Sequence, residues 1–145
     1  MTRTAALQEL FQQTAALFHR LRVSAERVHQ DGPDTAGRRG ILRSLDAGGP
    51  QTVPQLARAR PVSRQRVQVL VNGLLADGWV EIIPNPAHRR SGLVSLTRRG
   101  QSRLAAMLER EEALIGTLPI TASGAEIAAA AETLRSVRAA LEKIQ

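Results

Sequence analysis

The sequence predicts a mainly α-helical fold with one small β-hairpin, in which a helix–turn–helix segment and the hairpin lie between long helices. Two observations predict this fold. Apolar residues recur at three- and four-residue spacing over most of the chain, which is the period of an amphipathic helix. The exception is residues 79–83, a run rich in β-branched and aromatic residues that Pro84-Asn85-Pro86 interrupts and residues 93–96 resume.

The length of 145 residues suits one domain with helical arms. We expect the whole chain, 1–145, to form one unit of function. Within it, the helix–turn–helix and hairpin should form a lobe at residues 35–100, flanked by helical arms at 5–30 and 101–145.

The first two helices are expected from about residue 5 to 30 and from Thr35 to about Ala47. The turn-forming residues 31–34 end the first helix, and Gly48-Gly49-Pro50 ends the second. A broad apolar face on the first helix includes Leu7, Leu10 and Phe11. The second helix is expected to bury Ile41, Leu42 and Leu45.

A short third helix and a longer fourth helix follow, joined by a tight turn. Thr52 is a good N-cap for the third helix, and Pro54 lies in its first turn, where proline is tolerated. Ser63 is a good N-cap for the fourth. The fourth helix should bury a single stripe formed by Val67, Leu70, Val71, Leu74 and Leu75.

The opposite face of the fourth helix is rich in amide and guanidinium groups and carries no acid before Asp77. Such flat polar groups can make paired hydrogen bonds to base edges in the major groove of DNA. The candidates for base contacts are Gln65, Arg66, Gln68 and Asn72, with Val69 placed to touch a thymine methyl group. Ser63 and Arg64 are expected to hold phosphates near the helix N-terminus. The alternative for these residues is an ordinary solvated helix face.

The hairpin carries a positively charged tip. Asp77-Gly78 should end the fourth helix, and Thr97 should cap the next one. The tip contains His88, Arg89 and Arg90, and arginines in such a place can enter or flank the narrow, negative minor groove.

The segment VSRQRVQVLVNGLLADGWVEIIPNPAHRRSGLVSLTRRG, residues 62–100, resembles the MarR family of bacterial winged helix-turn-helix transcription regulators. The resemblance rests on the joint at residues 74–80 and on the closing motif at residues 94–100. It implies a cytoplasmic homodimer that binds double-stranded DNA at a palindromic operator, mostly as a repressor, and is released by a small-molecule effector. One departure is visible: the family's wing often reads Asp-Pro-x-Asp-Arg-Arg, whereas this chain has Asn85 and His88 in place of the two acids. An aspartate that would position a wing arginine is therefore absent.

A long helix is expected from Thr97 to about Gly116, and another after Ser123-Gly124-Ala125-Glu126, which has the spacing of a capping box. Apolar residues in the last helix repeat in alternating three- and four-residue steps, as in a coiled-coil seam. Such a narrow seam favours pairing with a second chain, and the alternative is packing within its own domain. The residues expected at the dimer interface are Leu7, Leu10, Phe11, Ile127, Leu134, Val137, Leu141 and Ile144.

The charge of the chain is concentrated in its middle. Residues 38–103 hold twelve arginines and three acids, a net charge of +9, whereas the two flanks together carry eight basic and ten acidic residues, a net −2. A basic centre of this kind is typical of a DNA-facing lobe.

Other classes of function find little support. The chain has no cysteine, which excludes disulfides, thiolate metal sites and thiol-based sensing. Glu26 and His29 have the spacing of some metal sites, with His19 one heptad earlier, but other nearby ligands are missing and we expect no metal or cofactor. No catalytic constellation is recognisable, no apolar run could span a bilayer, and we expect a non-enzymatic, cytoplasmic protein.

Two functions remain. The first is a dimeric, sequence-specific DNA-binding regulator. The second is a winged-helix module that binds another regulator and has weak or no specific DNA binding, for which the missing wing acids are the main support.

Overall fold

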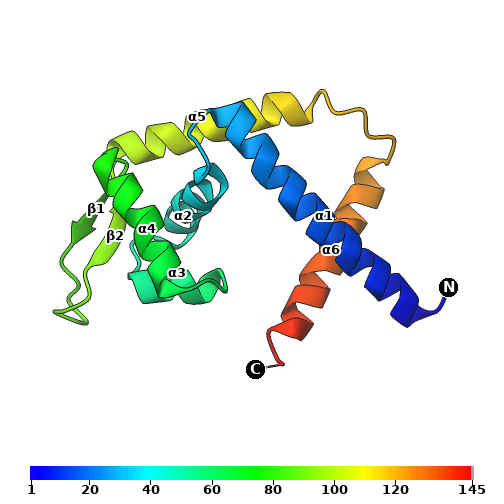
Figure 1. Ribbon diagram of the computed structural model, residues 1–145, viewed down its shortest axis with the longest axis horizontal. Helices are drawn as coiled ribbons and strands as arrows, with labels where there is room; N and C mark the ends of the chain where they lie inside the picture. Colours follow the sequence, from blue (N-terminus) through cyan, green and yellow to red (C-terminus); the bar gives the residue numbers. More distant parts are fainter. Residues whose placement is uncertain (145) are drawn as a thin grey trace. The chain divides into compact units, whose positions relative to one another are not determined.

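The computed structural model describes residues 1–144. In this part of the chain, helices account for most residues and a single antiparallel hairpin is present (Figure 1). The elements are α1 (Arg3–His29), α2 (Thr35–Gly48), α3 (Val53–Ala59), α4 (Arg64–Ala76), β1 (Val80–Ile83), β2 (Leu93–Leu96), α5 (Arg98–Ile115) and α6 (Gly124–Leu141). The predicted mainly α fold with a β-hairpin wing is confirmed.

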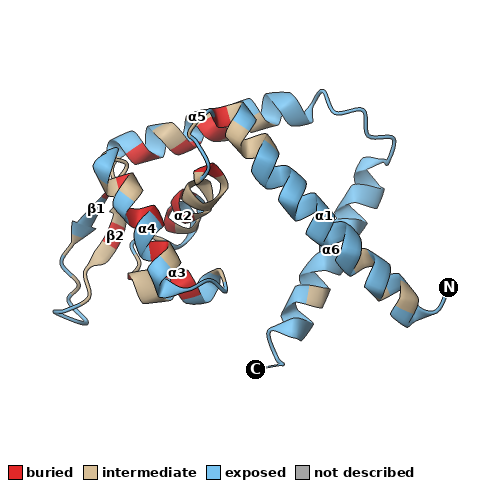
Figure 2. Cartoon of the chain, in the orientation of Figure 1, coloured by how far each residue is buried: buried red, intermediate tan, exposed pale blue. Residues whose placement is uncertain are grey.

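The chain divides into two compact units, Met1–Ala113 and Leu114–Gln145. The first contains the hydrophobic core, which α2, α3, α4, the hairpin and the first half of α5 build together (Figure 2). The core residues are Ile41, Leu42, Leu45, Leu56, Ala57, Val67, Leu70, Val71, Leu74, Val80, Val94, Leu104 and Met107. With the exception of Leu75, which is half-buried against this core, the predicted stripe of α4 is fully buried.

The second unit is built differently. Its helix α6 contains no buried residue, and Figure 2 shows it almost entirely in the colour of exposed residues. Ile127, Leu134 and Leu141, three positions of the predicted seam, are 49%, 38% and 53% exposed. None of the described helices is long and apolar enough to cross a membrane.

Side-chain caps set where the helices begin. The hydroxyl groups of Thr52 and Ser63 accept hydrogen bonds from the backbone N–H of Gln55 and Arg66, and Ser123 does the same for Glu126. Thr52 and Ser123 each form a complete capping box. Each of these three starts agrees with the expectation from sequence.

Most boundaries lie within one residue of those expected, and two differences have a clear structural cause. α1 begins at Arg3 instead of residue 5, because the hydroxyl of Thr2 caps it by accepting from Ala5 N at 3.1 Å. β1 begins at Val80 instead of Trp79, since the N–H of Trp79 still belongs to the end of α4 and donates to the carbonyl O of Leu74 at 3.0 Å.

The end of α4 is a Schellman motif. Gly78 has a φ of 73°, a conformation that glycine adopts without strain. Its N–H donates to the carbonyl O of Leu75 at 3.1 Å, next to the longer-range bond from Trp79. The hydroxyl of Thr97 donates to the carbonyl O of Gly78 at 2.7 Å and accepts from Gly100 N at 3.0 Å, which joins this turn to the start of α5. The joint and the closing motif of the sequence therefore form one structural unit.

The hairpin is anchored on both sides of β2. Val80 pairs with Leu96 and Ile83 with Leu93. Gln51, in the connection between α2 and α3, forms a bridge to Val94 through backbone hydrogen bonds of 3.1 and 2.7 Å. These bonds fix the position of the hairpin relative to the helix–turn–helix.

Candidate nucleic-acid interface

The outer face of α4 is exposed and polar. Gln65, Val69 and Asn72 are spaced by four and three residues and therefore share one face of the helix, opposite the buried stripe. The side chain of Val69 is held open to solvent, with 50% of the residue exposed. Gln68 lies beside them, and its Nε2 donates to the Oδ1 of Asn72 at 2.8 Å. This bond orients both amides before any partner is bound.

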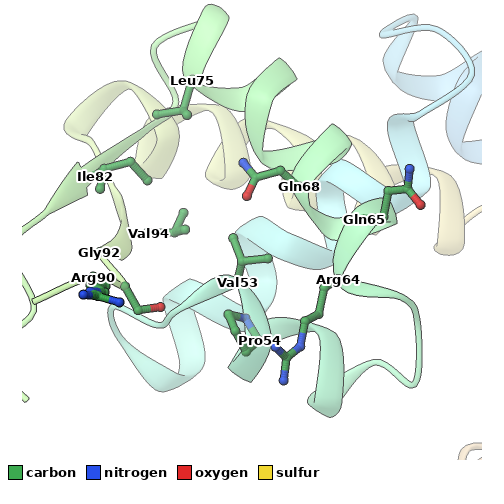
Figure 3. A pocket seen from close by; sticks show the side chains of 11 residues that line it. Val53, Pro54, Arg64, Gln65, Gln68, Leu75, Ile82, Arg90, Gly92 and Val94 are labelled. Carbon is green, nitrogen blue, oxygen red and sulfur yellow. The ribbon is translucent and has the colours of Figure 1, made fainter. Parts of the chain in front are cut away.

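A hollow of about 550 Å³ lies between α3, α4 and the hairpin. Its floor is apolar and includes Val53 and Val94, while Arg64 and Arg90 lie on opposite sides of it (Figure 3). Gln68 points into the hollow from α4. The complete lining is Val53, Pro54, Arg64, Gln65, Gln68, Leu75, Ile82, Arg90, Ser91, Gly92 and Val94. The structure thus brings residues of α4 and one arginine of the hairpin tip, predicted separately from the sequence, to a single concave surface.

Local hydrogen bonds order the tip of the hairpin, although Asn85 and His88 replace the two aspartates that are often found in a MarR wing. The side-chain Oδ1 of Asn85 accepts from Ala87 N at 3.1 Å, and its carbonyl O accepts from His88 N at 3.2 Å. Asn85 therefore folds the start of the tip into an Asx turn. His88, Arg89 and Arg90 are exposed, and neither arginine forms an ion pair within residues 1–144.

Arg66 stands apart from the other candidates for base contacts. It lies on the flank of α4, is only half-exposed, and its NH2 group donates to the Oδ1 of Asp34 at 2.7 Å. Asp34 directly precedes α2, so this ion pair joins α4 to the start of α2. The structure does not place Arg66 with Gln65, Val69 and Asn72.

Ion pairs divide the arginines of the basic centre into two groups. Four of them pair with acids that lie between 32 and 72 residues away, so their charge is used inside the protein. Those four are Arg38 with Asp77, Arg39 with Glu111, Arg66 with Asp34, and Arg103 with Asp31. The remaining arginines of residues 38–103 form no ion pair in the described part of the chain: Arg43, Arg58, Arg60, Arg64, Arg89, Arg90, Arg98 and Arg99.

Arg60 is the least accessible member of the second group. Burial lowers the pKa of its guanidinium, and the nearby positive charge of Arg39 lowers it further. The guanidinium lies directly against Gly40 of α2, where a Cβ would overlap it. Arg60 is therefore a poor candidate for a phosphate contact, because its position is fixed within the lobe.

His29 belongs to a polar junction between helices. Its side chain is fully buried, and its Nε2 lies 3.0 Å from the Oε1 of Glu111 in α5. Burial by itself raises the pKa of Glu111, but hydrogen bonds from Arg39 and His29 and their charges outweigh this and hold it below its ordinary value. Arg103 donates to the carbonyl O of His29 at 3.3 Å. Glu26, one turn before His29, is not its partner, and no group of three potential metal ligands occurs among the described residues.

The sequence did not predict the acidic partners of Arg38, Arg39, Arg66 and Arg103. It also did not predict the bridge between Gln51 and Val94. Each contact joins residues far apart in the chain, so no local spacing could reveal it. Trp79, expected at the joint between α4 and β1, is half-buried against the core, with the guanidinium groups of Arg103 and Arg38 at 5.1 and 5.9 Å from its ring centroid.

The helix–turn–helix and its hairpin together define a winged-helix protein. Residues 35–91 match the model of the MarR family. A crystal structure of the MarR family transcription regulator SP03579 has a TM-score of 0.79 to this chain and 26% sequence identity, and it covers 97% of this chain and 93% of its own. Residues 35–91 therefore resemble the MarR family in sequence, and the chain resembles a MarR family transcription regulator in fold.

Two curated relatives match over a shorter segment. The uncharacterized protein Rv2011c of Mycobacterium tuberculosis is 38% identical over 91 residues, which are 63% of this chain and 64% of the relative. The transcriptional activatory protein BadR of Rhodopseudomonas palustris is 32% identical over 96 residues, 59% of this chain and 54% of the relative. In both comparisons this chain spans less than two thirds of the relative's own length.

Proposed function

We propose that the protein is a homodimeric, sequence-specific DNA-binding transcription regulator that acts on a palindromic operator. The observation that carries this proposal is the concave surface between α4 and the hairpin. The amides of Gln65 and Gln68 and the unpaired arginines Arg64 and Arg90 line it, on a lobe with a net positive charge. The match of residues 35–91 to the MarR family and the likeness to a MarR family transcription regulator support the same function.

In this proposal the face of α4 lies in the major groove. Gln65, Gln68 and Asn72 would bond base edges, and Val69 would touch a thymine methyl group. Ser63 and Arg64 would contact phosphates at the start of the helix, where backbone N–H groups also favour an anion. The hairpin tip, with His88, Arg89 and Arg90, would reach the adjacent minor groove.

The homodimer would use the apolar faces of α1 and α6. Leu7 and Leu10 are half-buried and Phe11 is 44% exposed, while α6 presents its seam to solvent. The proposed interface comprises Leu7, Leu10, Phe11, Ile127, Leu134, Val137, Leu141 and Ile144. Pairing through such faces would place two recognition helices on successive turns of DNA, which raises both affinity and specificity.

The regulator would block transcription by occupying its operator, although the name of BadR, an activatory protein, makes activation the alternative. A small-molecule effector would release the DNA if it preferred a dimer whose recognition helices are wrongly spaced. The competing function is a winged-helix module that binds another regulator. The loss of both wing acids favours that reading, but the Asx turn at Asn85 orders the tip by other means.

The wing provides the test of the proposed function. We expect Arg89→Ala with Arg90→Ala to weaken binding to every duplex and to reduce the slope of log affinity against log salt by about 1.8, about 0.9 for each lost phosphate contact. Gln65→Ala should instead change which sequences are preferred and leave the salt slope intact. Selection of bound fragments from host DNA, followed by fluorescence anisotropy titrations, measures both effects.

The matched control is Arg20→Ala with Arg110→Ala. It removes the same charge from two exposed arginines outside the hollow. An unchanged salt slope in the wing variant would remove the wing from the interface. Absence of any DNA binding at low salt, combined with copurification of a different regulator, would favour the protein-interaction module.

A further inference from the structure

Asp34 occupies the position of an N-cap but does not act as one. It directly precedes α2, and aspartate is among the residues that most favour this position. Its side chain nevertheless forms no capping hydrogen bond. The carboxylate bonds the guanidinium of Arg66 at 2.7 Å instead, so a group suited to stabilise its own helix is committed to the recognition helix.

The position of Arg66 on α4 explains how this pair forms. Arg66 and Gly73 lie two turns apart on the same flank of the helix. A Cβ at Gly73 would overlap the guanidinium of Arg38 in α2, so this flank faces α2 closely. Arg38 in turn pairs with Asp77 at 2.7 Å. Two ion pairs, Asp34–Arg66 and Arg38–Asp77, therefore join α2 to the two ends of the recognition helix.

We propose that Asp34 is a positioning residue for DNA binding: it holds Arg66 against α2 and keeps that guanidinium away from the phosphates of bound DNA. The proposal rests on the proposed function and deepens it. A phosphate contact adds affinity for every sequence alike, because the backbone carries no base information. An arginine that is kept from the phosphates therefore lowers the affinity for DNA of any sequence. Discrimination between base sequences is then left to Gln65, Gln68 and Asn72.

The test is a double-mutant cycle on the full-length protein. Asp34→Asn removes the charge without removing a capping function, since Asp34 does not cap α2. We expect this variant to bind both operator and scrambled duplex about two- to fivefold more tightly at low salt, the range of a half-exposed ion pair. The salt slope should steepen by about 0.9, which corresponds to one added phosphate contact.

Arg66→Gln alone should leave the affinity and the salt slope at their wild-type values. In the Asp34→Asn background, Arg66→Gln should return the slope to wild type. The control is Asp46→Asn, which changes the net charge equally at an exposed residue of α2 that forms no ion pair within the described chain. It should not steepen the slope.

Two results would overturn the proposal. A loss of operator affinity of tenfold or more in Arg66→Gln, with a shallower salt slope, would mean that Arg66 contacts DNA in the wild-type complex. Equal behaviour of Asp34→Asn and Asp46→Asn would mean that only the net charge matters.

A second arm uses immobilised heparin, a polyanion without sequence, and separates this proposal from the proposed function. If the wild-type protein binds no duplex, the proposed function fails, and binding to heparin alone tests whether Asp34 keeps Arg66 away from a polyanion. Elution of Asp34→Asn at higher salt than Asp46→Asn supports the release of Arg66, and equal elution overturns it.

Discussion

The helix–turn–helix lobe and the C-terminal helix α6 begin with the same local device and then diverge. α3 in the lobe and α6 both start with a complete capping box, formed by Thr52 with Gln55 and by Ser123 with Glu126. In the lobe, the apolar residues that follow disappear into a shared core. In α6 none of the residues is buried, although apolar positions recur along it.

This difference shows that local capping interactions set where a helix begins, whereas tertiary packing decides whether its apolar face is buried within the same chain. A capping box stabilises the first turn equally well in either setting. The lobe has enough neighbouring elements to enclose its apolar stripes, and so its free surface is polar and charged. α6 keeps an apolar seam on its surface, which is expected of a helix that pairs with a second chain.

The largest expected effect is on the free energy of unfolding, when a leucine is truncated to alanine in the lobe and, for comparison, in α6. Leu74→Ala creates a cavity at a fully buried position and should lower the free energy of unfolding by about 2–5 kcal/mol. That loss should not depend on protein concentration. Leu134→Ala, at a partly exposed seam position, should cost less, and its cost should vary with concentration because it weakens association. Urea denaturation at two protein concentrations measures both, and equal concentration-independent losses would contradict the contrast.

Charged residues introduced into the seam of α6 should change the stability of the lobe little but should strongly weaken dimerisation. Leu134→Asp with Leu141→Asp should dissociate the proposed homodimer and weaken operator binding by about a hundredfold or more, since two linked half-site contacts become independent. Sedimentation velocity and anisotropy titrations measure these changes. Ala128→Asp with Ala139→Asp, exposed positions on the opposite side of α6, should leave the dimer intact. Retention of the dimer in the seam variant would place the interface elsewhere.

The smallest effect concerns the polar junction of the first unit. Glu111→Gln removes the carboxylate that Arg39 and His29 bond, and should lower the free energy of unfolding by about 1–2 kcal/mol at neutral pH. Because the folded-state pKa of Glu111 is lowered, its stabilisation is present above the ordinary value of about 4.3 and is lost as pH falls through the folded-state pKa. The difference between wild type and Glu111→Gln should therefore shrink on acidification below about pH 4. Thermal unfolding from pH 3 to 7 measures it.

Glu112→Gln provides the matched control for this experiment. Its side chain is exposed, lies next to Glu111 in α5, and forms no ion pair among residues 1–144. A stability curve for Glu111→Gln that runs parallel to the wild-type curve down to pH 3 would mean that Glu111 contributes nothing through its charge.

Much of the fold could be predicted from the sequence because the deciding interactions are local. The caps at Thr52, Ser63 and Ser123 act over three residues, and β2 was placed with its observed bounds. The boundaries that differed, at Thr2 and Trp79, depend on single hydrogen bonds at helix ends, where composition gives little guidance. For the candidate site, the sequence predicted the polar face of α4 and the basic tip of the hairpin, and their contacts with DNA stay a prediction.

The sequence by itself determined the order of the elements, the buried stripe of α4, and the polar face opposite it, because the helical period alone separates those two faces. Only the tertiary structure decided which arginines remain free to meet an anion. Arg38, Arg39, Arg66 and Arg103 look no different in sequence from Arg64 or Arg90, yet each has an acid brought to it by the packing of another element. A charge is neutralised by whatever lies within a few ångströms of it, and that distance is set by the fold.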